Sequence, residues 1–213
     1  MIDKLISLLK AKSEDLNLFS AGDRLKLKEK HMVDALAVLQ IWSPKKSEKA
    51  IDLGTGGGIP GLALAVSCPD VNFTLIDSCA KKVHALEEIS AELKLKNVDF
   101  SCERIEEVAH YSAYRENFDS AFARAVAPLP TLLEYASGFL RAHGFFYAWK
   151  SADYSAELAS SLRAQKELNL KFVHAFPYVL PEGEARVILV FKKTAKLSPA
   201  YPRGVGVPKG KPI

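Results

Sequence analysis

Apolar residues recur along the chain with two different spacings, which predict two kinds of structure. Over residues 1–43 they recur every three or four positions, as at Met32, Leu36 and Leu39, which predicts helix with a wide apolar face. A Ser-Pro pair at 43–44 ends this pattern. After that pair, short apolar runs alternate with helical patterns, which is typical of consecutive strand–helix units and a parallel sheet.

Seven strands and five helices are predicted after the Ser-Pro pair. The last two strands are separated only by a Pro-Glu-Gly turn at 181–183, so they are expected to pair antiparallel. The predicted fold class is therefore α/β, with a mainly parallel seven-stranded sheet that contains one antiparallel strand. The predicted strands are 49–53, 73–76, 98–102, 120–123, 145–149, 171–176 and 186–192, and the predicted helices are 59–67, 81–95, 105–110, 129–140 and 156–168.

These patterns divide the chain into three parts. Residues 1–44 are expected to form an N-terminal helical extension, and residues 45–194 the α/β domain. Residues 195–213 form a tail rich in Pro and Gly, which is expected to lie extended on the surface. Six of the 29 Lys and Arg residues fall in 192–213, which has no Asp or Glu. Such a basic tail fits contact with a polyanion and fits simple solvation equally well.

Composition narrows the class of protein. Hydrophobic residues make up 48% and charged residues 25% of 213, which is ordinary for a globular chain. No apolar run approaches the roughly 18 residues of a membrane span, and charges interrupt the first 19 residues, so a cytoplasmic protein without a signal peptide is expected. No exposed apolar seam is apparent, which favours a monomer. The cysteines, which form no C-x-x-C pair and predict neither disulfide nor metal site, are Cys68, Cys79 and Cys102.

The strongest local signal is the segment 52–61, which reads DLGTGGGIPG at the end of the first predicted strand. Glycines between a strand and a helix let the backbone approach a ligand closely, and free amides at the helix start can meet an anion. The segment contains G-x-G-x-x-G, the dinucleotide fingerprint, which alone is weak. It also contains D-x-G-x-G beginning at Asp52, the form found in methyltransferases. A dinucleotide site usually has an apolar residue at the position of Asp52, so the methyltransferase interpretation is favoured and an NAD(P)-dependent oxidoreductase is kept as the alternative.

Further candidate residues lie where the next strands end. Asp77 ends the second strand, where a carboxylate accepts hydrogen bonds from both hydroxyls of a ribose. After the third strand, Ile105 can pack on an adenine ring and Glu106 can accept hydrogen bonds from its amino group.

Arg124 ends the fourth strand within an otherwise small and apolar run. It is expected either to clamp a carboxylate or phosphate, or to pair with Asp119 or Asp52. His31 and Asp34 are three residues apart on one helix face. They are expected to hold the region around Arg124, or to lock the N-terminal helix onto the core.

Taken together, these segments resemble the RsmG (GidB) family, which makes N7-methylguanosine in bacterial 16S rRNA. The resemblance covers nearly the whole chain, and the ordered set is far more specific than any single motif. It departs at Lys150-Ser151, where the family commonly has Lys-Gly, and at 183–186, where GEAR replaces a more usual Glu-Arg-His. The segments that carry it are Asn17-Leu18, 31–36 (HMVDAL), 52–61, 75–78 (LIDS) with 81–82 (KK), 93–98 (LKLKNV), 104–107 (RIEE), 124–129 (RAVAPL), 201–203 (YPR) and 208–212 (PKGKP).

The resemblance implies a Rossmann-like class I methyltransferase fold and transfer of a methyl group from S-adenosyl-L-methionine to N7 of a guanine in 16S rRNA or the small ribosomal subunit. A methyltransferase for another substrate and a non-catalytic RNA-binding module are the further alternatives. The residues implied for the cofactor are Gly54, Gly56, Ile59, Asp77, Ile105, Glu106 and Arg124. The residues implied for RNA are His31, Asp34, Lys81, Lys82, Arg186 and Arg203.

Guanine N7 carries a lone pair and no proton, so its methylation needs no general base. Catalysis is then expected to consist of positioning N7 in line with the methyl group, and no residue is assigned as a catalytic acid or base. No metal is expected to take part.

Overall fold

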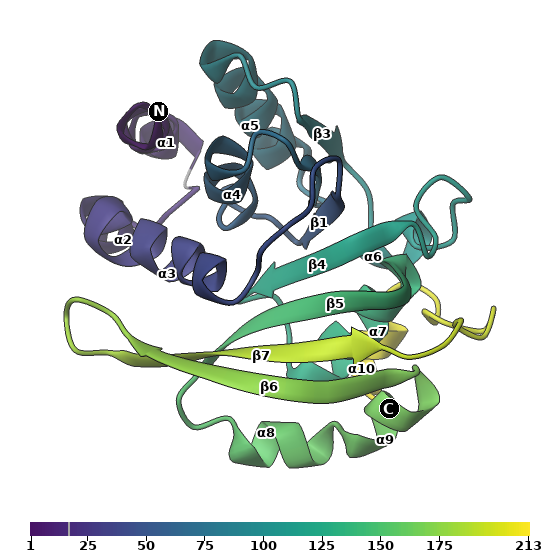
Figure 1. Ribbon diagram of the computed structural model, residues 1–213. Coiled ribbons are helices and arrows are strands. Elements are labelled where there is room, and N and C mark those ends of the chain that lie inside the picture. Colours follow the sequence, from purple (N-terminus) through teal and green to yellow (C-terminus); the bar gives the residue numbers. More distant parts are fainter. Residues whose placement is uncertain (17) are drawn as a thin grey trace.

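The computed structural model describes residues 1–16 and 18–213; Asn17, one half of the Asn-Leu pair, lies outside the described residues. The chain forms a seven-stranded sheet in the order β3-β2-β1-β4-β5-β7-β6, and β7 runs antiparallel to both neighbours (Figure 1). The predicted mixed sheet is therefore confirmed. The strands are β1 (Lys49–Leu53), β2 (Asn72–Ile76), β3 (Val98–Ser101), β4 (Phe118–Arg124), β5 (Leu140–Ser151), β6 (Leu170–Val179) and β7 (Ala185–Lys193).

Helices cover both faces of the sheet, which explains why the central strands β1 and β4 are buried almost along their whole length. Figure 1 shows α1, α3, α4 and α5 on one side and α7, α8, α9 and α10 on the other, and each side has its own apolar core. The helices are α1 (Ile2–Leu16), α2 (Ala21–Leu25), α3 (Val33–Leu36), α4 (Gly61–Ser67), α5 (Ala80–Leu93), α6 (Ile105–Val108), α7 (Leu129–Phe139), α8 (Ser155–Ser160), α9 (Leu162–Glu167) and α10 (Val207–Gly210).

The helical pattern over 1–43 is divided into α1, which has 15 residues, and several shorter pieces. Ser20 caps α2 by accepting a hydrogen bond from the backbone N–H of Asp23 at 3.2 Å, which starts a new helix. A π-helical turn, Leu27–Met32, leads into α3, and a 3₁₀ turn, Ala37–Gln40, follows it. The extension is helical as predicted, but it folds back on itself and covers α4.

Two expectations for the second half of the chain are corrected. The single helix predicted over 156–168 is two helices with Ser161 between them, where the Ser161 N–H donates to the Leu158 carbonyl at 3.1 Å and the Ser161 hydroxyl donates to the same carbonyl at 2.7 Å. The tail is not simply extended. It forms α10, and its Pro202 and Pro208 are buried. The Thr131 hydroxyl on α7 donates to the Pro208 carbonyl at 2.9 Å, so the tail packs as part of the fold.

Within 1–16 and 18–213, none of the helices combines the length and the hydropathy needed to cross a membrane.

Candidate active site

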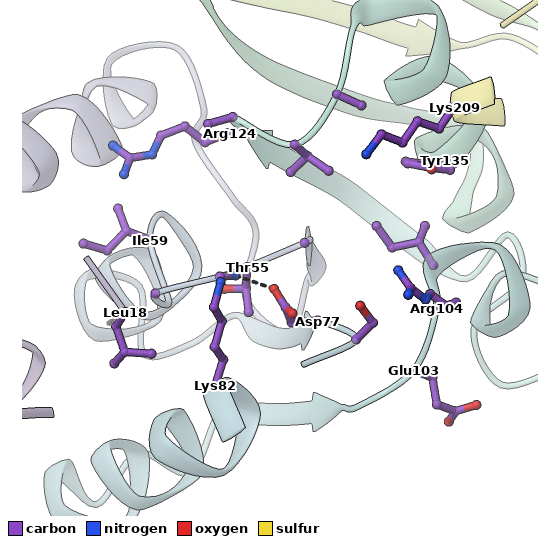
Figure 2. Close-up of a pocket in the computed structure, with 18 of the residues that line it drawn as sticks. Leu18, Thr55, Ile59, Asp77, Lys82, Glu103, Arg104, Arg124, Tyr135 and Lys209 are labelled. Atoms are coloured by element: carbon purple, nitrogen blue, oxygen red, sulfur yellow. Dashed lines mark hydrogen bonds between the residues drawn. The ribbon is translucent and has the colours of Figure 1, made fainter. Parts of the chain in front are cut away.

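A cavity of about 680 Å³ opens at the edge of the sheet where the parallel strands end. This volume lies within the range of about 300–1,000 Å³ that is common for small-molecule sites. Figure 2 shows Asp77 pointing into the cavity, with Arg124 at one end and Tyr135 with Lys209 at the other. All seven residues predicted for the cofactor line it, namely Gly54, Gly56, Ile59, Asp77, Ile105, Glu106 and Arg124.

The loop between β1 and α4 forms the floor of the cavity, and it requires glycine for two physical reasons. Gly54 has a φ of +69°, and a Cβ there would lie 3.0 Å from Cγ2 of Val126. A Cβ on Gly57 would lie only 2.6 Å from Cζ of Phe19, which comes from the N-terminal extension. The loop therefore requires glycine both for its backbone conformation and for the close approach of its neighbours.

Asp52 lies beneath this loop and does not line the cavity. Its side chain is buried, and Oδ2 accepts hydrogen bonds from the Thr55 hydroxyl at 2.7 Å and from the Gly61 N–H at 2.9 Å. Burial raises its pKa to about 6. The other oxygen, Oδ1, is buried without a donor from the part of the chain that is described. Asp52 thus organises the glycine loop from below.

Asp77 ends β2 and is held by two backbone N–H groups. Oδ2 accepts from Gly56 at 2.8 Å, and Oδ1 accepts from Cys79 at 2.9 Å. A carboxylate oxygen has more than one acceptor position, so each oxygen can accept a further hydrogen bond from the cavity side. The carboxylate is oriented for a ligand that offers two neighbouring hydroxyl donors.

Glu106, at the start of α6, is buried against the opposite end of the cavity. Its Oε1 accepts from the Tyr135 hydroxyl at 3.2 Å and from the Gly206 N–H at 2.9 Å. Burial, together with the nearby Glu106 carboxylate, raises the pKa of Tyr135 to about 12, so the phenol stays a donor. Ile105 lies beside Glu106 in the same wall. Sequence reasoning missed Tyr135 and Gly206, which reach Glu106 from 29 and 100 residues away.

Arg124 joins the end of β4 to the N-terminal extension. Its Nη1 donates to Oδ2 of Asp34 at 2.7 Å, and its Nη2 donates to Nδ1 of His31 at 3.1 Å. The expected pairing with Asp119 or Asp52 is wrong, because the guanidinium reaches across to α3 instead. His31 and Asp34 therefore hold the region around Arg124, one of the alternatives expected from their spacing.

The network continues outward from these two residues. His31 Nε2 lies 3.1 Å from Oδ1 of Asp23, so it carries the proton while Nδ1 accepts. Burial and the charge of Arg124 lower the pKa of His31, which keeps the ring neutral. Asp34 also accepts from the Tyr178 hydroxyl on β6. The extension is thus fastened to both β4 and β6.

The six residues predicted for RNA do not form one surface. His31 and Lys82 line the cavity, and Lys81 is exposed on α5. Asp34 is buried behind them. The remaining two are in ion pairs, Arg186 with Glu184 at 2.6 Å and Arg203 with Glu134 at 2.7 Å.

The fold and the cavity define the class of protein. Three features define this class as the Rossmann-like, S-adenosylmethionine-dependent methyltransferases. They are a mainly parallel seven-stranded sheet with β7 reversed, a glycine loop after β1 and a carboxylate at the end of β2. Solved structures of this class share the fold. TYW2 of M. jannaschii in complex with AdoMet superposes with a TM-score of 0.60 at 14% identity over 84% of this chain and 78% of that one. A SAM-dependent O-methyltransferase from Thermotoga maritima gives 0.58 at 14% identity over 78% and 66%.

Sequence relatives define the family. The profile described as rRNA small subunit methyltransferase G, GidB, matches residues 1–180. Ribosomal RNA small subunit methyltransferase G of Deinococcus radiodurans is 37% identical over 99% of this chain and 83% of its own length. The protein of the same name from Desulfitobacterium hafniense is 39% identical over 94% and 83%. The chain belongs to this methyltransferase G family, and the oxidoreductase alternative is therefore set aside.

Proposed function

We propose that this protein transfers the methyl group of S-adenosyl-L-methionine to N7 of a specific guanine in 16S rRNA of the small ribosomal subunit. The observation that carries the proposal is a family match over most of the chain, combined with one cavity that holds the glycine loop, Asp77 and Glu106. The relatives are named as methyltransferases of small-subunit rRNA. The basic residue Lys82 lines the same cavity, and its neighbour Lys81 is exposed on α5.

The chain's own residues fit the cofactor at three places. Asp77 accepts hydrogen bonds from the two ribose hydroxyls, since each of its oxygens keeps an acceptor position. Ile105 offers an apolar face to the adenine, and Glu106 accepts from the adenine amino group. The glycine loop, which a Cβ at Gly54 would crowd, leaves room for the methionine end.

When bound, S-adenosylmethionine supplies an electrophilic methyl group on its sulfonium. The protein residues have to hold guanine N7 in line with that methyl group, and no proton has to be removed. His31 fits this requirement, because its two ring nitrogens are already engaged by Arg124 and Asp23. The Arg124 network then serves to fix the wall of the cavity against which the base is positioned.

RNA binding is assigned to the residues that remain accessible. Lys82 lines the cavity and Lys81 is exposed, and neither forms an ion pair with any residue in the described ranges. These two lysines are the ones that we assign to contacts with phosphates near the target base. Guanine N7 inside a helical RNA lies in a deep groove, so the target has to be presented in a loop or unstacked. We assign the protein to the cytoplasm. We also assign it as a monomer, for which light scattering coupled to gel filtration should give a mass of 23.4 kDa.

The proposal is tested by methyl transfer to RNA. Radiolabelled S-adenosylmethionine is incubated with the protein and small subunits, free 16S rRNA or rRNA fragments, with Asp77→Ala as the inactive control. Incorporation into 16S rRNA, mapped to one guanine by the backbone cleavage that follows reduction of N7-methylguanosine, supports the proposal. A label that maps to another atom overturns the proposal. The absence of label from every form of 16S rRNA, when a different substrate is methylated, overturns it as well.

A further inference from the structure

The C-terminal segment 198–210, called the strap below, closes one side of the cavity. Val205, Gly206 and Lys209 line the cavity, and Figure 2 shows Lys209 near Tyr135. The strap is bound to the fold along its length. The Arg115 guanidinium donates to the carbonyls of Tyr201 at 2.9 Å and Ser198 at 3.1 Å. This basic segment is therefore a wall of the site and not a solvated tail.

Arg203 anchors the strap to α7. Its Nε lies 3.0 Å from Oε1 of Glu134, its Nη2 lies 2.7 Å from Oε2, and its backbone N–H donates to Oε1 at 2.7 Å. Glu134 is fully buried. A buried carboxylate requires a paired cation, and a bidentate guanidinium supplies charge and direction together. Nε and Nη2 of Arg203 are thus engaged by Glu134 inside the protein.

Three residues beyond this anchor, the strap reaches the carboxylate proposed for the adenine. The Gly206 N–H and the Tyr135 hydroxyl both donate to Oε1 of Glu106. None of the described residues donates to Oε2, so that oxygen is left as an acceptor. Gly206 has a φ of +78°, the left-handed region that favours glycine, and this conformation turns its N–H toward Glu106.

We infer that the strap is a positioning element of the cofactor site. Arg203 anchors it, and Gly206 orients Glu106 so that Oε2 receives the adenine amino group. The strap therefore sets both the affinity for the adenosine part of the ligand and the preference for adenine over a base with a carbonyl at that position. Arg203 is a positioning residue for the cofactor, and it does not contact RNA. This inference rests on the proposed function, since it takes Glu106 as the adenine acceptor.

The glycines of the strap provide a matched pair of variants. An added Cβ meets nothing within 4 Å at Gly204 or at Gly206, but only Gly206 has a positive φ. Calorimetry measures the dissociation constants of S-adenosylhomocysteine and S-inosylhomocysteine. Gly206→Ala is expected to raise the dissociation constant of S-adenosylhomocysteine about tenfold, because a hydrogen bond to a charged acceptor is disturbed. It is also expected to lower the preference of the protein for this ligand over S-inosylhomocysteine. Gly204→Ala is expected to behave as wild type.

An unchanged affinity and an unchanged preference in Gly206→Ala overturn the inference while leaving the proposed function intact. Wild-type protein that fails to bind S-adenosylhomocysteine overturns the proposed function itself. A general loss of stability would weaken both ligands equally, so the ratio of the two constants separates positioning from damage to the fold.

Arg203 is tested against Arg141, which pairs with Asp119 through a largely exposed side chain. Arg203→Ala is expected to lower the affinity for S-adenosylhomocysteine about tenfold or more. Arg203→Lys is expected to restore part of that affinity, since lysine keeps the charge but not the bidentate hydrogen bonds of the guanidinium. Arg141→Ala is expected to have no effect. If Arg203→Ala instead lowers RNA affinity and leaves cofactor affinity unchanged, Arg203 is an RNA contact and the inference is wrong. If this variant does not fold, Gly206→Ala decides.

Discussion

Replacing Asp77 by Ala is expected to abolish most of the affinity for the cofactor. The carboxylate keeps one acceptor position on each oxygen, because each oxygen is already bonded to one backbone N–H, that of Gly56 or Cys79. Two hydrogen bonds from ribose hydroxyls to a charged acceptor contribute about 1.5–3 kcal/mol each. Losing both costs about 3–6 kcal/mol, which corresponds to about a 10²- to 10⁴-fold rise in the dissociation constant.

Asp77→Asn separates ligand contacts from loop order. The amide keeps an oxygen that can accept from the Gly56 N–H, but its NH₂ group replaces the acceptor that faces Cys79. We expect about a 10- to 100-fold loss for this variant, between wild type and Asp77→Ala.

The assay is calorimetric titration with S-adenosylhomocysteine, with circular dichroism and thermal unfolding to establish that each variant is folded. A folded Asp77→Ala protein that binds with wild-type affinity would refute the reasoning, since no ribose would then lie on this carboxylate.

Three further outcomes are expected. The pKa of Asp52 is about 6 in the fold against 3.8 ordinarily, so its stabilising contribution is complete below pH 3.8 and lost as the pH rises through 6. Asp52→Asn should therefore be more stable than wild type at pH 7.5 by up to about 3 kcal/mol, and urea denaturation should show this gain disappearing as the pH falls to 4. Lys81→Ala and Lys82→Ala should each lower the slope of log K against log salt for RNA binding by about 1, and unchanged slopes would exclude phosphate contacts. Asp34→Ala, which leaves the guanidinium of Arg124 unpaired, should cost about 3–5 kcal/mol of stability in the same urea assay, and a cost below about 1 kcal/mol would contradict the buried pair.

The arrangement of the sheet could be predicted because it depends on local patterns. Each parallel strand is a short apolar run, and buried strands between helices have no polar face. The residues at the ends of β1, β2 and β4 could be found for a related reason. Parallel strands end at one edge, so Gly54, Asp77 and Arg124 had to meet there.

The internal breaks in the helices could not be predicted in the same way. A wide apolar face over residues 1–43 is compatible with one long helix or with several short ones. The choice depends on where Ser20 finds the N–H of Asp23 and on how the extension packs against α4. The apolar pattern over 156–168 likewise does not mark Ser161, where the backbone N–H bonds to the carbonyl of Leu158 and α8 gives way to α9.

Contacts between distant segments account for what was missed in the site. Nothing local links Glu106 to Gly206, and the Pro and Gly residues that are common in the strap predict a surface tail. One signal was available. Glu134 is the single charged residue in α7, a helix that is otherwise apolar and is buried throughout. A carboxylate in such a helix has to find a cation, and α7 offers none.

The basic tail supplies that cation, so part of its positive charge is used within the fold. Arg203 neutralises Glu134 inside the protein, so its charge does not extend toward RNA in the way that an exposed lysine's does. Lys209, further along the chain in α10, lines the cavity. A basic residue therefore indicates nucleic-acid contact only where its charge is not already paired with a buried carboxylate of the fold. Here the buried carboxylate of Glu134 accounts for Arg203, one of the six basic residues in 192–213, as an internal contact.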